Sequence, residues 1–131
     1  MRKLNCVLLI DDDEPTNFLN KLTLKKMGCV ENIVTAFDGQ EALNYLTEHQ
    51  RGNPPELIFL DINMPLMNGW EFLEEYQLLS FDNDPPVVIM LTTSINPDDE
   101  EKSKKYSTIA GFMHKPLDLE EINKLIEKYF N

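Results

Sequence analysis

An acidic cluster at the end of an apolar run is the first feature of this sequence that could do chemistry. The run at residues 5–10 is followed by Asp11, Asp12, Asp13 and Glu14. Neighbouring carboxylates repel one another and raise one another's pKa unless a cation neutralises them. Mg²⁺ prefers oxygen ligands, takes few carboxylates from a protein and leaves room for water and phosphate. The cluster therefore indicates part of a site for a hard cation.

Later apolar runs also close with side chains that could serve such a site. These side chains are Asp61, Thr92 and Lys115. If the runs are neighbouring strands of a parallel sheet, their carboxyl ends meet at one edge, where functional sites of such sheets lie. Asp12 and Asp61 are then expected as direct or near ligands of the cation, and Asp11 as a ligand through water.

The residues after Asp61 extend the expected site. The backbone carbonyl of Asn63, two residues further along, could supply a neutral oxygen. Taken singly, each of these residues also has an ordinary structural interpretation: an acidic turn is often a solvated loop or a helix cap, Thr92 suits any strand because it is β-branched, and a lone lysine is usually a surface charge. Their convergence at one sheet edge is what favours the functional interpretation.

Five short runs have strand length and turn residues on their flanks. They lie at residues 5–10, 32–37, 56–61, 87–92 and 110–115. Most are continuously apolar, which is typical of strands buried on both faces of a parallel sheet.

Helical patterns fill the intervals between the strands, at residues 15–27, 39–50, 69–81, 97–107 and 118–130. Asp13 is the expected cap of the first helix and Gly28 its stop. The apolar side of that helix is expected to consist of Phe18, Leu19, Leu22 and Met27. Strict alternation of strand and helix predicts an α/β domain of the (βα)5 type, with a doubly wound parallel sheet and helices on both faces.

Length and composition limit the class of protein. A chain of 131 residues is enough for one domain, expected over residues 1–131. With 42% hydrophobic residues and two cysteines, it is neither disordered nor a disulfide scaffold. The net charge of −11 argues against direct nucleic-acid binding and suits cations and basic protein surfaces. No run approaches the roughly 20 apolar residues of a membrane span, and no signal peptide is evident, so we expect a cytoplasmic location.

Four motifs in this order resemble the receiver domain of response regulators in two-component signalling. They are LLIDDDE, LIFLDINMPLMNGWEFL, VVIMLTTS and GFMHKPL, and the resemblance covers about residues 5 to 130. It implies a flavodoxin-like fold with strand order 2-1-3-4-5. The sequence departs from the common pattern at Asn68, where Asp is frequent, at Thr93, where Ala is frequent, and at Phe112, which lacks the hydroxyl of the tyrosine variant.

The resemblance implies a role for each residue at the expected site. Asp61 is the phosphoacceptor, and the acidic pair Asp11 and Asp12 binds Mg²⁺, or Mn²⁺ in its place, together with Asp61 and the Asn63 carbonyl. Lys115 contacts the phosphoryl group.

The same motifs imply a switch and an unusual peptide bond. Thr92 and Phe112 occupy the positions of the switch residues, and the Lys115–Pro116 bond is expected to be cis, which is a turn feature.

As a function, the resemblance implies a phosphoacceptor switch in a two-component system or phosphorelay. A sensor histidine kinase or a histidine phosphotransfer protein is the expected donor, and an unknown downstream protein the expected target. The domain would catalyse only its own phosphorylation and dephosphorylation, and so is not an ordinary enzyme. It is either a stand-alone receiver, similar to chemotaxis regulators, or part of a longer chain.

Two other classes of protein fit parts of the pattern. A magnesium-dependent phosphatase or phosphotransferase with an aspartyl nucleophile also places an Asp at a strand end, but usually has a second carboxylate two residues on, where this chain has Asn63. A flavodoxin-type FMN binder needs Ser, Thr and Gly amides in the first loop, and the run DDDEP would repel its phosphate. Turnover of a small phosphate ester, or flavin absorbance, would distinguish these classes.

Overall fold

The computed structural model describes residues 3–82 and 84–130, so the outermost residues of the expected 1–131 domain lie outside it. Its five strands pair in parallel in the order β2-β1-β3-β4-β5. The strands are β1 (Leu4–Ile10), β2 (Val30–Ala36), β3 (Leu57–Asp61), β4 (Val87–Thr92) and β5 (Ile109–His114). This confirms the predicted fold class and strand order.

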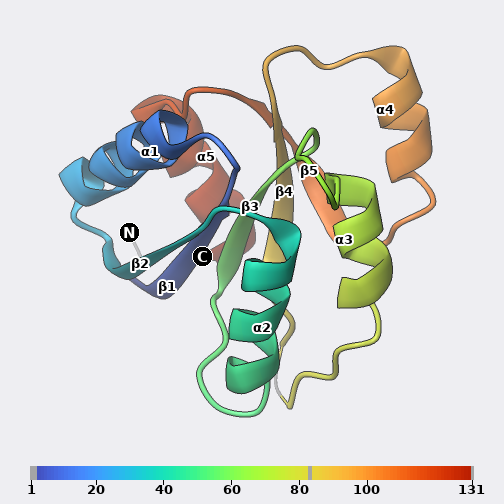
Figure 1. Ribbon diagram of the computed structural model, residues 1–131. Coiled ribbons are helices and arrows are strands. Elements are labelled where there is room, and N and C mark those ends of the chain that lie inside the picture. Colours follow the sequence, from blue (N-terminus) through green and yellow to red (C-terminus); the bar gives the residue numbers. More distant parts are fainter. Residues whose placement is uncertain (1–2, 83, 131) are drawn as a thin grey trace.

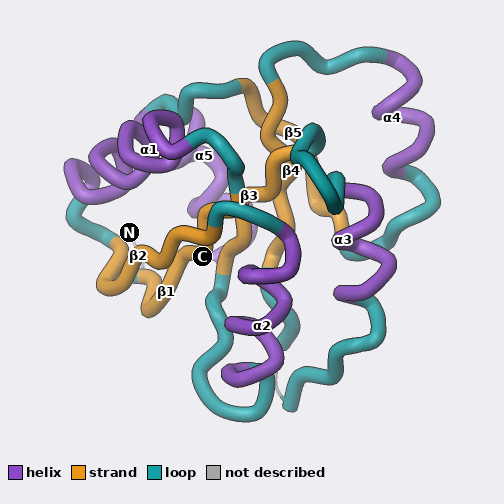
Figure 2. Tube along the Cα trace, viewed as in Figure 1, coloured by secondary structure: helices purple, strands orange, loops and turns teal. Residues whose placement is uncertain are grey.

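The helices cover both faces of the sheet, as Figures 1 and 2 show. They are α1 (Glu14–Met27), α2 (Gly39–His49), α3 (Gly69–Tyr76), α4 (Pro97–Ser103) and α5 (Leu119–Phe130). One core cluster joins side chains of α1 and α5 to the sheet, and the other joins α2 and α3 to the opposite face. Every residue of the central strand β3 is buried, which explains why residues 57–60 are all apolar.

Two helices end earlier than the sequence predicts. α3 ends at Tyr76 rather than at residue 81, because Leu79 and Phe81 turn back onto the core cluster under α2 and α3. α4 ends at Ser103 rather than at residue 107, and the next residues continue in a tight turn, with Tyr106 N–H donating to the Ser103 carbonyl. Boundaries depend on such tertiary contacts, which local patterns do not contain.

The orientation of α1 contradicts the prediction from its apolar pattern. Phe18 is 60% exposed and Leu19 is 53% exposed, whereas Asn17, Asn20 and Leu24 are buried. The expected cap and stop are present: Asp13 accepts a hydrogen bond from Thr16 N–H, and Gly28 is left-handed at φ 70°. The helix is therefore placed correctly in the sequence but turned so that Phe18, Leu19 and Leu22 are exposed, whereas Met27 packs against the core as predicted.

None of the helices in the described part of the chain combines the length and the apolar character that a membrane span requires.

Candidate functional site

The predicted site residues meet at the edge of the sheet where the strands end. Asp11 directly follows β1, Asp61 and Thr92 close β3 and β4, and Lys115 directly follows β5. Since all five strands are parallel, their carboxyl ends share one edge. Asp11 and Asp61 are only 1% and 3% exposed, so two carboxylates are buried side by side.

Lys115 bridges the two buried carboxylates. Its Nζ lies 2.9 Å from Asp11 Oδ2 and 2.9 Å from Asp61 Oδ1. The backbone also fixes this lysine, because its N–H donates to the Thr92 carbonyl at 2.9 Å. The bond between Lys115 and Pro116 is cis. The lysine is thus tied to strands on both sides of the site.

The carboxylates of Asp11, Asp12 and Asp61 form a group with the character of a metal site. One oxygen from each lies within 4.8 Å of the others, and Asp12 is exposed to solvent. Three carboxylate oxygens and one accessible side fit a hard divalent cation that keeps water ligands. The backbone N–H of Asn63 lies close enough to the Asp61 carboxylate to lower its pKa, so Asn63 lies beside the group, while coordination by its carbonyl stays a prediction.

Burial and neighbouring charges shift the pKa values of Asp61 and Lys115, which face each other. The pKa of Asp61 is raised to about 6, first because burial removes its carboxylate from water and then because of the Asp11 charge, against the opposing effect of Lys115. Burial lowers the pKa of Lys115, but Asp11 and Asp61 outweigh it and the pKa lies above its ordinary value. The lysine is therefore charged, and Asp61 is ionised at neutral pH at a considerable cost.

The two predicted switch residues lie next to the site in different environments. Thr92 is 5% exposed, and its hydroxyl donates to the Ser94 carbonyl at 2.8 Å. Phe112 is half-buried and packs against the core cluster under α2 and α3. Their roles in switching stay predictions.

The loop between β3 and α3 returns closely to Asp61. Gly69 N–H donates to the Ile62 carbonyl at 2.7 Å, and a Cβ on Gly69 would lie 2.8 Å from the Asp61 carbonyl oxygen. Asn68 caps α3 in a reciprocal pair with Glu71, which explains why Asn can stand there in place of Asp. Only glycine fits the close approach at residue 69.

Two residues that support the site are not among those predicted from the sequence. Asn17 Nδ2 donates to the Asp11 carbonyl at 2.8 Å, and Asn20 Oδ1 accepts from Leu117 N–H at 3.0 Å. The signal available in the sequence was a pair of asparagines three residues apart in a helix that directly follows the acidic cluster.

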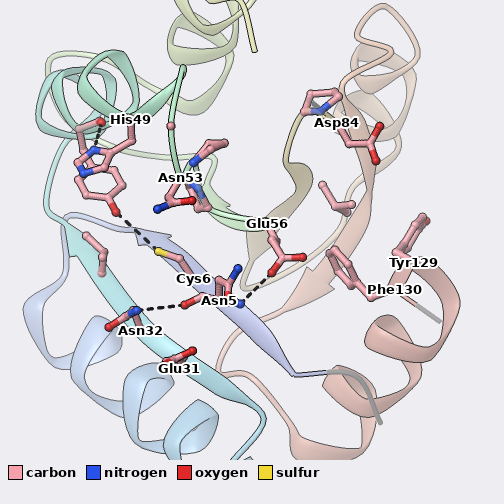
Figure 3. A pocket seen from close by; sticks show the side chains of 17 residues that line it. Asn5, Cys6, Glu31, Asn32, His49, Asn53, Glu56, Asp84, Tyr129 and Phe130 are labelled. Atoms are coloured by element: carbon pink, nitrogen blue, oxygen red, sulfur yellow. Dashed lines mark hydrogen bonds between the residues drawn. The ribbon is translucent and has the colours of Figure 1, made fainter. Parts of the chain in front are cut away.

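A cavity of about 800 Å³ lies at the opposite edge of the sheet, where the strands begin (Figure 3). Asn5 and Cys6 of β1 line it together with Tyr45 of α2, and Cys6 Sγ lies 3.7 Å from Tyr45 Oη. Burial raises the pKa of the Cys6 thiol. The cavity contains none of the predicted site residues, so we do not take it as the candidate functional site.

Comparison with known proteins identifies the class. The response regulator receiver domain family matches residues 7–127, and the chain belongs to this family. A crystal structure of a two-component response regulator from Cytophaga hutchinsonii superposes with a TM-score of 0.86 at 35% identity, covering 97% of both chains.

Two curated proteins also resemble this chain in sequence. The chain is 30% identical to the probable methanogenesis regulatory protein FilR2 of Methanothrix harundinacea, over 93% of this chain and 79% of that protein. It is 32% identical to an uncharacterized response regulatory protein of Vibrio cholerae over 92% of this chain, but this match spans only 43% of that protein. The match thus accounts for less than half of the Vibrio protein.

Proposed function

We propose that this chain is a phosphoacceptor switch in which Asp61 receives a phosphoryl group from a phosphohistidine. The proposal rests on one arrangement: three carboxylates whose oxygens lie within 4.8 Å, with the Lys115 ammonium 2.9 Å from two of them. Such a site presents a nucleophilic oxygen beside groups that offset charge on a phosphoryl group, which is most of what phosphoryl transfer requires.

In the proposed reaction an Asp61 oxygen attacks phosphorus. The new O–P bond forms while the P–N bond to the histidine breaks, and the imidazole nitrogen keeps the electron pair. Lys115 then pairs with a phosphoryl oxygen in place of the Asp61 carboxylate, which has become part of the acyl phosphate. Asp11, Asp12, Asp61 and the Asn63 carbonyl would hold Mg²⁺ or Mn²⁺, which supplies positive charge to the phosphoryl oxygens.

The donor is a sensor histidine kinase or a histidine phosphotransfer protein. α1 begins three residues after Asp11, and its exposed side chains Phe18, Leu19 and Leu22 form an apolar face beside the acidic loop. We assign docking of the donor to this face because a protein seated there reaches the edge that carries Asp61. The two cysteines are free and fit the reducing cytoplasm, where we place the reaction.

The test uses acetyl phosphate with Mg²⁺, followed by intact-mass measurement of wild type, Asp61→Asn and Asp13→Asn. Asp13 is an exposed helix cap two residues from Asp11, and Asn caps helices equally well, so this variant is a matched control. Wild type and Asp13→Asn should gain one phosphoryl group only when Mg²⁺ is present, and Asp61→Asn should gain none. Equal labelling of Asp61→Asn would end the proposal.

A further inference from the structure

The buried face of α1 is polar at two positions where a core helix normally has apolar residues. Asn17 and Asn20 are 2% and 1% exposed, although Phe18 and Leu19 on the same helix are mostly exposed. Burying a carboxamide is unfavourable unless hydrogen bonds compensate for the lost water. The bonds that these two side chains make therefore indicate why the polar residues face inward.

Asn17 holds the loop that carries the acidic pair. Its Nδ2 donates to the Asp11 carbonyl at 2.8 Å and lies 3.4 Å from the Ala36 carbonyl. Asp11 N–H itself donates to the Ala36 carbonyl at 3.1 Å. The Asn17 amide thus ties the end of β1 to the end of β2, next to Asp11 and Asp12, whose carboxylates belong to the candidate metal site.

Asn20 holds the loop that carries the lysine. Its Oδ1 accepts from Leu117 N–H at 3.0 Å, a contact between residues 97 positions apart. Leu117 follows Lys115 by two residues, and Pro116 between them has no N–H to anchor the loop. The Asn20 bond is therefore the next backbone anchor after Lys115 N–H.

Each asparagine is only half satisfied. Asn17 Oδ1 and Asn20 Nδ2 are buried and have no hydrogen-bond partner within the part of the chain that the structure describes. An apolar side chain at either position would avoid the cost of a buried polar atom without a partner. The benefit of the asparagines therefore lies in the hydrogen bonds to the Asp11 carbonyl and from the Leu117 N–H.

We propose that Asn17 and Asn20 are positioning residues of the phosphorylation site, Asn17 for its carboxylate half and Asn20 for its lysine half. This inference rests on the proposed function. α1 serves as a brace. Its two asparagines lie one helical turn apart and fix the two loops whose charged groups must meet. The two asparagines therefore have separable effects, because one loop binds the cation and the other contacts the phosphoryl group.

The experiment compares Asn17→Leu and Asn20→Leu with the control Thr23→Val. These changes nearly keep side-chain size, and Thr23 lies on the same helix with its hydroxyl bonded to the Leu19 carbonyl of that helix. Each variant is titrated with MgCl₂ by calorimetry. Each is then phosphorylated with acetyl phosphate at saturating Mg²⁺, and its Tm is recorded.

Asn17→Leu should weaken Mg²⁺ binding about tenfold, as expected when a group behind a ligand is lost, with a near-normal rate at saturating Mg²⁺. Asn20→Leu should bind Mg²⁺ normally and be phosphorylated about tenfold to a hundredfold more slowly, because Lys115 is misplaced. Asn20→Ser keeps an uncharged oxygen that can accept from Leu117 N–H and should recover part of the rate, and it provides a second variant if Asn20→Leu fails to fold.

The inference is overturned if folded Asn17→Leu and Asn20→Leu match Thr23→Val in both measurements. It is also overturned if each variant loses Mg²⁺ affinity and rate together, because that result would indicate general destabilisation. If wild type takes no phosphoryl group at all, the proposed function fails, whereas the Mg²⁺ titration of Asn17→Leu still tests the brace.

Discussion

The Asp61 carboxylate lies in surroundings that oppose its own ionisation. It is 3% exposed and faces Asp11 as well as Lys115, and its pKa is raised from 3.8 to about 6. Such a group is a better proton acceptor than an ordinary aspartate, and a cation bound beside it would relieve the cost of its charge. Binding of a cation at this site would therefore also affect the reactivity of the Asp61 oxygen.

The raised pKa predicts that Asp61→Asn stabilises the metal-free protein at neutral pH. Between pH 3.8 and 6 the folded state binds the Asp61 proton more tightly than the unfolded state does, so this group's contribution falls as pH rises through that window. At pH 7.5 ionisation of this group lowers the free energy of unfolding by about 3 kcal/mol relative to the protonated form. Asn does not ionise and should recover part of this amount, since it also loses the ion pair with Lys115.

Urea unfolding in EDTA at pH 7.5 and pH 4 checks this expectation. Asp61→Asn should exceed wild type at pH 7.5, and the difference should shrink at pH 4. Asp13→Asn is the control. The hydrogen bonds from Thr16 lower the pKa of Asp13, so its ionised form is favoured in the folded protein, in contrast to Asp61. A wild type that is more stable than Asp61→Asn at pH 7.5 would contradict the electrostatic account.

Gly69 gives a second prediction at the scale of one residue. Ala at the start of a helix is normally better than Gly by up to about 1 kcal/mol. Here its Cβ would lie 2.8 Å from the Asp61 carbonyl and 3.0 Å from Ile62 Cα, both backbone atoms, so Gly69→Ala should instead lower the free energy of unfolding by about 1 to 3 kcal/mol.

Chemical denaturation compares Gly69→Ala with Gly52→Ala, where a Cβ meets nothing within 4 Å. The control should be neutral or slightly stabilising. If both substitutions stabilise the protein, the close approach of this loop to Asp61 is wrong.

At the scale of elements, β4 and β5 carry the residues that could transmit phosphorylation. In this structure the Thr92 hydroxyl is engaged with the Ser94 carbonyl, so contact with a phosphoryl oxygen requires that bond to break. Phe112 on β5 is half-buried and could follow into the space that Thr92 leaves. A local hydrogen bond would then change the face made by α4, β5 and α5.

Amide NMR with beryllofluoride and Mg²⁺ tests this coupling. Signals of residues 92–115 should shift in wild type, and in Thr92→Val the shifts around Phe112 should be lost while those around Asp61 persist. Unchanged signals throughout 92–115 in wild type would remove the switch.

α4 is the helix with the weakest attachment to the core. None of its seven described residues is buried, and in Figure 1 it lies at the margin of the fold. Tyr106, just beyond its end, stacks on Trp70 with ring centroids 5.6 Å apart and donates to Glu74 Oε1 at 2.7 Å. Lys102 of α4 lies 5.2 Å from the same Trp70 ring. This aromatic contact with α3 therefore holds the helix.

Tyr106→Ala should accordingly speed amide hydrogen exchange in α4 and leave β3 and β4 protected, because exchange reports local opening. Tyr106→Phe keeps the stack and loses only the Glu74 bond, so it should show a much smaller effect. Equal protection of α4 in Tyr106→Ala and wild type would show that other contacts hold this helix.

For the whole molecule, the α/β pattern and the charged strand ends could be predicted because they depend on local sequence. Continuous apolar runs gave the five strands, and the family motifs gave their order. The orientation of α1 could not be predicted in this way: counting apolar residues favours Phe18 and Leu19 inside, whereas the partners of Asn17 and Asn20 are backbone groups on other segments. A helix face is chosen by its neighbours as well as by its own composition.

The same limit applies to the site. The residues that converge could be named from their places at strand ends, but the 2.9 Å contacts of Lys115 with two carboxylates depend on how β5 and its following loop are placed. Charge balance across the molecule, from β1 to β5, is thus a property of the complete fold. The central claim is that this balance makes one oxygen, on Asp61, the nucleophile.

Mapping the modified residue tests that claim most directly. The protein is phosphorylated with acetyl phosphate and Mg²⁺, the acyl phosphate is reduced with borohydride, and peptides are sequenced by mass spectrometry. The account predicts homoserine in place of aspartate at residue 61 alone, dependent on Mg²⁺. Homoserine at residue 11 or 12, or modification that persists without the metal, would contradict it.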